Sequence, residues 1–138
     1  MENLIERLPV KILVHTTSSY PCPESDVNLS CLENIYYLAE EIGLSGHYTA
    51  GNGAIEAAAV ALGATYIERQ FTWDRTWKGS DQAASLEPAG MINVVKAVRQ
   101  IERVRGSGIK NVMPSEIAVM RKLNIGNANA TAFYQDKS

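Results

Sequence analysis

The stretch AAAVALGATYIERQFT, residues 57–72, joins a run of small residues directly to a run typical of a strand. The alanine-rich segment 54–63 predicts a helix whose small side chains permit a close approach to a sheet. Side chains alternate between the two faces of the strand expected in 64–72, and these faces carry Tyr66, Glu68 and Gln70 on one side and Ile67, Arg69 and Phe71 on the other. A helix followed at once by a strand is the repeating pattern of α/β proteins.

Upstream of this stretch the same alternation is expected. The short apolar run VKILV at 10–14 predicts a strand buried on both faces. Helical spacing of apolar residues predicts an amphipathic helix over 31–42, begun by a capping box of Ser30 and Glu33 and ended by Gly43. A short strand is expected within 43–49 because helices precede and follow it.

Downstream, two more helices are expected. Pro88 suits the first turn of a helix whose apolar stripe ends at Gly106, and a last short helix begins at Pro114. The order is strand, helix, strand, helix, strand, long loop, helix, helix. This order predicts an α/β fold with a parallel sheet.

The totals fit an ordinary globular domain. The 138 residues are 46% apolar and 20% charged, and the formal net charge is −2. This charge offers no basic field for nucleic acid or anionic lipid, and no apolar run approaches the roughly 18 residues of a membrane span. The N-terminus has no signal-peptide pattern. The two cysteines are expected to be free thiols, so a cytoplasmic location is the simplest prediction.

Polar residues gather where the predicted strands end, and the ends of parallel strands are where ligands bind in barrels and open sheets. The three loops concerned are 15–20, 45–49 and 68–81. Both histidines of the chain, His15 and His47, lie just past a predicted strand. An imidazole together with carboxylates suits a divalent metal such as Mn²⁺ or Zn²⁺.

Other interpretations of these loops stay open on residue types alone. The serines near the strand ends could hold a phosphate or carboxylate, although such turns are common without any ligand. The acids of the long loop could simply be neutralised by its bases, and composition alone favours this salt-bridged loop, in which Glu68, Asp74 and Asp81 would pair with Arg69, Arg75 and Lys78.

Taken together, four segments resemble the sialic acid synthases. They are HTTSSYPCPESDVNL at 15–29, GLSGH at 43–47, the opening stretch, and DRTWKGSDQAASLEP at 74–88. The resemblance runs from about residue 10 to residue 123. It implies the last three βα units of a TIM barrel over residues 1–123, with 124–138 as a flexible tail.

The resemblance also implies a reaction and a set of site residues. The family condenses phosphoenolpyruvate with N-acetylmannosamine or its 6-phosphate, using a divalent metal such as Mn²⁺ to polarise the sugar's aldehyde. The matching positions are two catalytic candidates, Glu68 and Asp81; five substrate-binding candidates, His15, Ser18, Tyr20, Ser45 and Lys78; and the metal-ligand candidates His47 and Gln70. No role is specified for His15.

The sequence departs from the family at the site. Gln70 and Gln82 stand where the family has histidines, and an amide oxygen is a weaker ligand than an imidazole. The loop 48–54 is two residues longer than the family's. A TIM barrel has eight strands in about 250 residues, whereas three strands are expected here.

Two hypotheses follow from this mixture. The chain is a synthase part that acts only with a companion supplying the remaining strands of the barrel. The alternative is a non-catalytic, truncated descendant that covers its exposed sheet edges by self-association or with a partner. Both hypotheses predict that this chain associates with copies of itself or with a partner.

Overall fold

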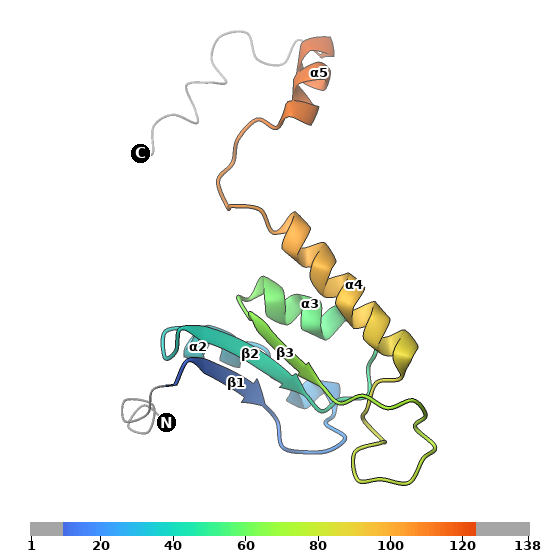
Figure 1. Ribbon diagram of the computed structural model, residues 1–138. Coiled ribbons are helices and arrows are strands. Elements are labelled where there is room, and N and C mark those ends of the chain that lie inside the picture. Colours follow the sequence, from blue (N-terminus) through green and yellow to red (C-terminus); the bar gives the residue numbers. More distant parts are fainter. Residues whose placement is uncertain (1–9, 124–138) are drawn as a thin grey trace. The chain divides into compact units, whose positions relative to one another are not determined.

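The computed structural model describes residues 10–123, so the tail predicted at 124–138 lies outside the described residues. It divides into two compact units, 1–105 and 106–138. The first unit contains all elements except the last (Figure 1). In chain order the elements are β1 (Ile12–Thr16), the 3₁₀ turn η1 (Glu24–Asp26), α2 (Cys31–Ile35), β2 (Glu41–Gly46), α3 (Ala54–Ala61), β3 (Tyr66–Arg69), α4 (Pro88–Val104) and α5 (Pro114–Lys122).

The three strands form one parallel sheet in the order β1-β2-β3. Strands that are neighbours in sequence are therefore neighbours in space, with a helix in each crossover. This arrangement is that of consecutive βα units in a TIM barrel, and it confirms the predicted α/β fold with a parallel sheet. Side chains of partnered residues lie on the same face of a parallel sheet, so the register fixes which residues share a face.

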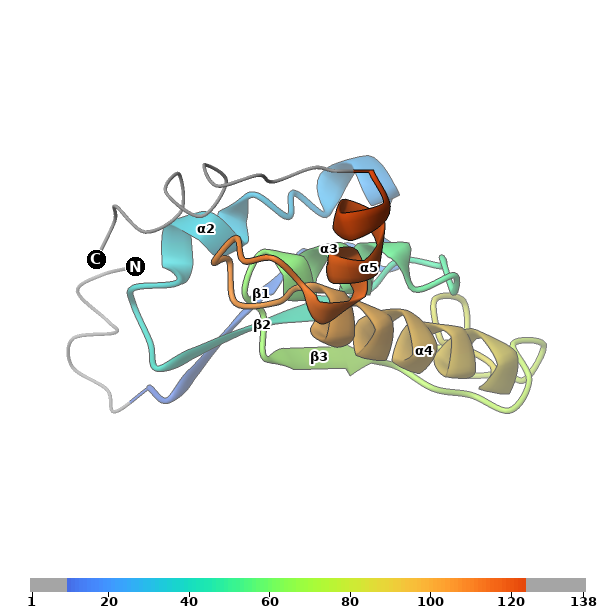
Figure 2. The same cartoon turned by 90° about the horizontal axis from the view of Figure 1, so that it is seen from above.

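The hydrophobic core lies on one face of this sheet. Ile42 and Leu44 of β2 pack there with Leu32 of α2 and Ala59 of α3, all at most 4% exposed. Figure 2 shows α2 and α3 together on that side of the strands. Burying a large aliphatic side chain contributes about 1.5–3 kcal/mol, so this layer accounts for the helices' attachment.

The helix predicted over 31–42 is wrong beyond Ile35. Glu41–Gly46 is instead the central strand β2, which is paired on both sides. Ile42 fits a helical stripe and an alternating strand equally well, and tertiary pairing decides between them. Gly43 does not stop a helix: a Cβ there would lie 2.6 Å from the Tyr66 carbonyl oxygen, so glycine permits β2 and β3 to approach. Ser30 makes no side-chain capping bond, so the capping box is also wrong.

The remaining elements agree more closely with expectation. The first strand begins and ends two residues later than predicted, at Ile12–Thr16. β3 ends at Arg69, and its continuation is a single parallel bridge from Phe71 to Leu86. The helices α3, α4 and α5 occur where expected, the last two with proline in the first turn.

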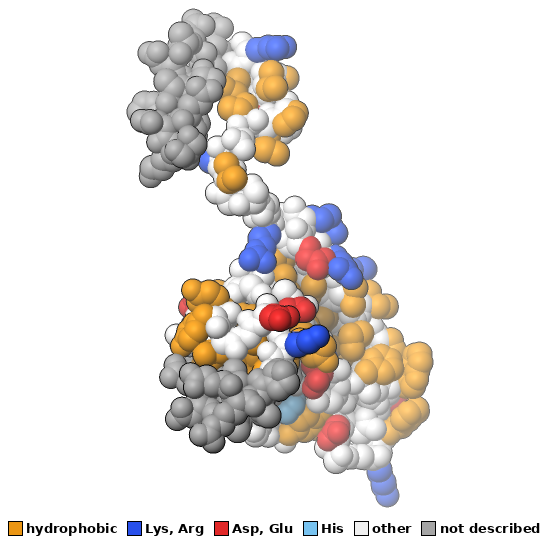
Figure 3. All heavy atoms as spheres, turned by 60° about the vertical axis from the view of Figure 1, so that its left-hand side comes forward, with side chains coloured by type: hydrophobic (Ala, Val, Ile, Leu, Met, Phe, Trp, Pro, Cys, Tyr) orange, Lys and Arg blue, Asp and Glu red, His pale blue; other side chains and the backbone are white. Residues whose placement is uncertain are grey.

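The surface of the described residues carries mixed charge. Acidic and basic side chains lie next to one another on the face shown in Figure 3. Both cysteines are free, as expected. Among the described helices, none has the length and apolar character needed to cross a membrane.

Candidate functional site

The C-terminal ends of β2 and β3 bring Ser45 and Glu68 together. These residues are partners in the parallel register and lie on the face opposite the helices. The Ser45 hydroxyl donates a hydrogen bond of 2.8 Å to Glu68 Oε1. Ser45 is buried and Glu68 is exposed, so the pair sets a carboxylate at the open face of the sheet. The predicted alternation of Glu68 and Ile67 between faces is therefore correct.

His47 and Gln70 follow this pair, each two residues further along the chain and just past the end of its strand. Among the described residues, His47 Nδ1 and Gln70 Oε1 are two of only three buried side-chain polar atoms that have no hydrogen-bond partner. Leaving a buried polar atom unpaired costs about 1–3 kcal/mol. Each such atom is therefore a candidate contact for a water, an ion or a ligand. The third is Arg69 Nε, for which we have no physical account.

Tyr20 closes over this edge from the loop after β1. Its ring meets the His47 imidazole edge-on, with 5.3 Å between ring centres. Its hydroxyl donates to the backbone oxygen of Asp81, which links the loop after β1 to the loop after β3. The Asp81 carboxylate itself is exposed, and its backbone oxygen also accepts a bond of 2.6 Å from Ser85.

The other candidates lie apart from this cluster. His15 is the register partner of Leu44, so its side chain lies on the helix-covered face, with Nε2 2.7 Å from the Val27 backbone oxygen. Ser18 and Lys78 are exposed loop residues. The structure thus brings Ser45 to Glu68 and Tyr20 to His47, and Gln70 follows Glu68 by two residues along the chain.

The salt-bridged loop is not found within residues 10–123. Arg69 pairs with Glu56 instead of Glu68, and both side chains are at most 2% exposed. Arg75 donates to the backbone oxygens of Ser85 and Thr49, at 2.7 and 3.0 Å. Arg69 and Arg75 therefore bind loop backbone, and neither pairs with Glu68, Asp74 or Asp81.

The buried cluster of Tyr48, Glu56 and Arg69 was missed by sequence reasoning. The Tyr48 hydroxyl donates 2.9 Å to Glu56 Oε1, and the Arg69 guanidinium lies 4.1 Å above the Tyr48 ring. Burial, followed by repulsion from the Glu56 carboxylate, raises the pKa of Tyr48 well above its ordinary value of 10. The sequence feature that could have indicated this cluster is Glu56, the one charged residue in the alanine-rich helix α3.

Two side chains at this edge carry atoms of kinds that bind divalent cations. Imidazole nitrogen and amide oxygen both bind such ions, and the two atoms of these kinds, His47 Nδ1 and Gln70 Oε1, are buried without partners. Within the described residues no group of three or more His, Cys, Asp and Glu side chains gathers as a metal site. The donor set is therefore sparse, and one of its members is a neutral amide.

Comparison with known proteins now decides the lineage. The sequence profile of the NeuB family matches residues 6–110. This chain belongs to the NeuB family. Over 109 residues it is 48% identical to N-acetylneuraminate-9-phosphate synthase of Homo sapiens, a match that covers 78% of this chain and 30% of that protein.

Other NeuB relatives agree. N,N'-diacetyllegionaminic acid synthase of Campylobacter jejuni is 40% identical, over 80% of this chain and 34% of its own length. The crystal structure of a sialic acid synthetase from Leptospira borgpetersenii, in complex with citrate, superposes with a TM-score of 0.69 at 36% identity. That superposition covers 83% of this chain and 40% of that one. The chain thus spans about 30% of the length of the curated relatives first matched.

Proposed function

We propose that this chain supplies part of the active site of a sialic acid synthase. The reaction joins the methylene carbon of phosphoenolpyruvate to the aldehyde carbon of N-acetylmannosamine or its 6-phosphate. Water adds to the next carbon, and inorganic phosphate leaves. The observation that carries the proposal is the pair of unpartnered buried atoms on His47 and Gln70 beside the Ser45–Glu68 hydrogen bond.

The proposed roles follow from where each side chain lies. Ser45 orients the Glu68 carboxylate through its hydroxyl, and Glu68 faces the open side on which the sugar would bind. Tyr20 covers His47 and restricts water there. The exposed Ser18 and Lys78 suit the anionic end of phosphoenolpyruvate, whereas Asp81 would line the sugar through its loop.

A divalent cation such as Mn²⁺ would be held by His47 and Gln70. When bound, it would supply Lewis-acid polarisation of the aldehyde. His47 is fixed in orientation by the Tyr20 ring, and its buried Nδ1 has no competing hydrogen bond. His15 has no part in this proposal because it lies on the other face.

The proposal includes a partner. Three parallel strands do not close a barrel, so within residues 10–105 the face that carries Ser45 and Glu68 is open. A companion polypeptide with the remaining strands, or further copies of this chain, would cover it. A cytoplasmic location, expected from the free thiols, stays a prediction.

One observation favours a second candidate, a non-catalytic binding role. Position 70 holds an amide oxygen, a weaker ligand than the family's imidazole, and position 82 lacks a histidine as well. In this alternative the chain keeps the half-barrel and its partner but holds no cation.

Titration of Mn²⁺ into the full chain, followed by electron paramagnetic resonance, tests the proposal. We expect one Mn²⁺ per chain, and Gln70→His tightens its binding by about tenfold because imidazole is the stronger ligand. Gln100→His on the exposed side of α4 adds the same side chain elsewhere and is the matched control, with no change expected. Absence of stoichiometric binding in both the wild type and Gln70→His would overturn the cation site and favour the second candidate.

A further inference from the structure

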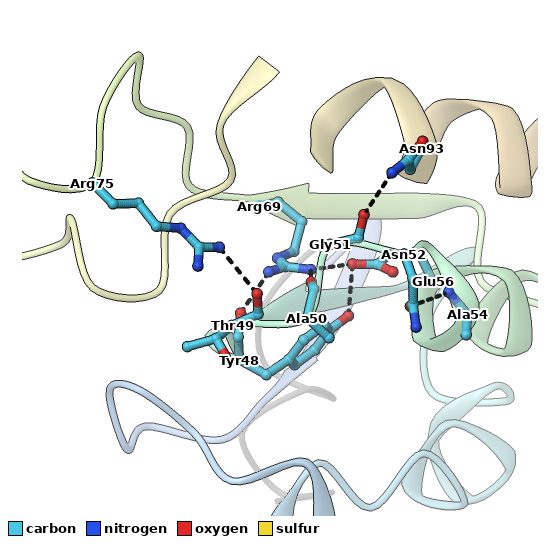
Figure 4. Close-up of polar contacts among 10 residues, drawn as sticks. All are labelled: Tyr48, Thr49, Ala50, Gly51, Asn52, Ala54, Glu56, Arg69, Arg75 and Asn93. Atoms are coloured by element: carbon cyan, nitrogen blue, oxygen red, sulfur yellow. Dashed lines mark hydrogen bonds and ion pairs between the residues drawn. The ribbon is translucent and has the colours of Figure 1, made fainter. Parts of the chain in front are cut away.

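In the loop after β2, side chains donate to the backbone carbonyl of every residue in 48–51. Tyr48 O accepts from Arg69 Nη2 at 2.5 Å, and Ala50 O accepts from Arg69 Nη1 at 3.1 Å. Thr49 O accepts from Arg75 at 3.0 Å, and Gly51 O accepts from Asn93 at 3.3 Å (Figure 4). Loop carbonyls usually face water, so bonds from three side chains to four consecutive carbonyls define one backbone path.

Arg69 is the centre of this arrangement. It lies between Glu68 and Gln70 in sequence, but its side chain lies on the opposite face of β3 and is 2% exposed. There the guanidinium pairs with Glu56 of α3 while it binds the two loop carbonyls, as Figure 4 shows. A buried guanidinium is stable only when its charge is neutralised and its hydrogen-bond needs are largely met. Glu56 neutralises the charge, and the loop carbonyls accept from both terminal nitrogens, while Nε has no partner among the described residues.

The bound loop begins at the residue after His47. The strand that carries Arg69 also carries Glu68, and Gln70 follows directly after it. One guanidinium therefore connects the end of β3 to the backbone that follows the candidate ligand of β2. This connection runs behind the sheet and leaves the open face free.

We propose that Arg69 is a positioning residue, whose planar fork fixes the loop after His47 and thereby sets the imidazole relative to Gln70. This inference rests on the proposed function, since it concerns the same cation site. The role needs the geometry of arginine and more than its charge. A lysine would neutralise Glu56, but its single nitrogen does not reproduce the fork that reaches two carbonyls.

Arg69→Lys in the full chain tests the proposal. Outer-shell groups that orient a ligand typically change metal affinity by about 10–100-fold, so we expect Mn²⁺ binding to weaken by about tenfold or more. The backbone amides of residues 48–52 should exchange with solvent faster, and the His47 ring should give broadened or multiple NMR signals. The free chain supplies these last two readouts without any metal.

A control separates positioning from stability. Val60→Ala removes buried apolar volume from α3, which weakens the fold without touching the loop carbonyls. Even where Val60→Ala lowers the free energy of unfolding as much as Arg69→Lys does, it should leave the Mn²⁺ affinity and the His47 NMR signal unchanged. The inference would be overturned if the Mn²⁺ affinity of Arg69→Lys lies within twofold of that of the wild type and its His47 signal is unchanged.

The two proposals fail in different ways. If the wild type binds no Mn²⁺, the cation site is wrong, and the His47 ring signal alone decides the role of Arg69. A single sharp signal, unchanged in Arg69→Lys, counts against positioning. Broadened or multiple His47 signals in Arg69→Lys, together with a single sharp signal in Val60→Ala, support the positioning role.

Discussion

Individual side chains at this sheet edge divide between its two faces. Ser45 and Glu68 face the open side, whereas Arg69 faces the helices, in accord with the period of two along a strand. This division was predictable for Glu68, Ile67 and Arg69 from alternation alone. The partner of Arg69 was not, because Glu56 lies 13 residues away on a helix and only the packed fold brings it close.

Tyr48 makes stability depend on pH in the alkaline range. Its pKa is raised in the folded chain by burial and by Glu56, so above pH 10 the unfolded chain loses a proton that the folded chain retains. The contribution of Tyr48 to the free energy of unfolding is fully present below pH 10. It falls as the pH rises further, by up to about 1.4 kcal/mol per pH unit. We expect Tyr48→Phe to remove this part of the slope.

Urea unfolding of both proteins between pH 8 and about 11.5 measures the effect. The quantity of interest is the difference between the two stability curves, since other tyrosines and lysines titrate in both proteins. Parallel curves across this range would show that Tyr48 is not protected.

At the scale of elements, glycine permits close approach in two places. Gly43 lets β2 and β3 approach, and Gly53 lets α3 begin against α4. The sequence predicted α3 correctly but misplaced the boundary between α2 and β2. The apolar residues within 36–43 fit both the period of a helix and that of a strand. The strand forms because β2 pairs with strands on both sides, and no local sequence pattern records this pairing.

Two glycines with positive φ offer a matched comparison. Gly53 has φ +80°, and a Cβ there would lie 2.6 Å from Ala97 Cβ and 2.9 Å from the Asn93 oxygen. Gly63 has φ +104° and open space around it. Alanine at either position costs about 1–2 kcal/mol of backbone strain, and overpacking adds about 1–3 kcal/mol at position 53 alone. We therefore expect Gly53→Ala to destabilise more than Gly63→Ala in urea unfolding; equal losses would show that α3 and α4 do not meet closely.

For the whole molecule, the open face of the sheet predicts association. Ile12 and Tyr66 lie on the face opposite the core and are 41% and 40% exposed. Unpaired edges and apolar faces favour self-assembly or a partner. Static light scattering at micromolar concentration should give a mass above 15.1 kDa, and Ile12→Ser with Tyr66→Ser should reduce it. A clean monomer of the wild type contradicts this expectation.

The fold class was predictable at this scale, and so was the sheet edge on which the candidate site is proposed. Alternation of strands and helices determines a parallel sheet, and polar loops at strand ends indicate the ligand side. The side of the sheet on which His15 lies was not predictable from its place after a strand. It depended on a strand end two residues later than expected and on its register with Leu44.

The most direct test of the synthase proposal is phosphate release by the reconstituted barrel. The chain is produced together with a polypeptide carrying the strands that precede this segment in NeuB family proteins. Inorganic phosphate is then measured with phosphoenolpyruvate, N-acetylmannosamine 6-phosphate, or both, in the presence of Mn²⁺. We predict release that requires both substrates and falls by about 100-fold or more in His47→Ala. No release, or release that His47→Ala leaves unchanged, would contradict the account.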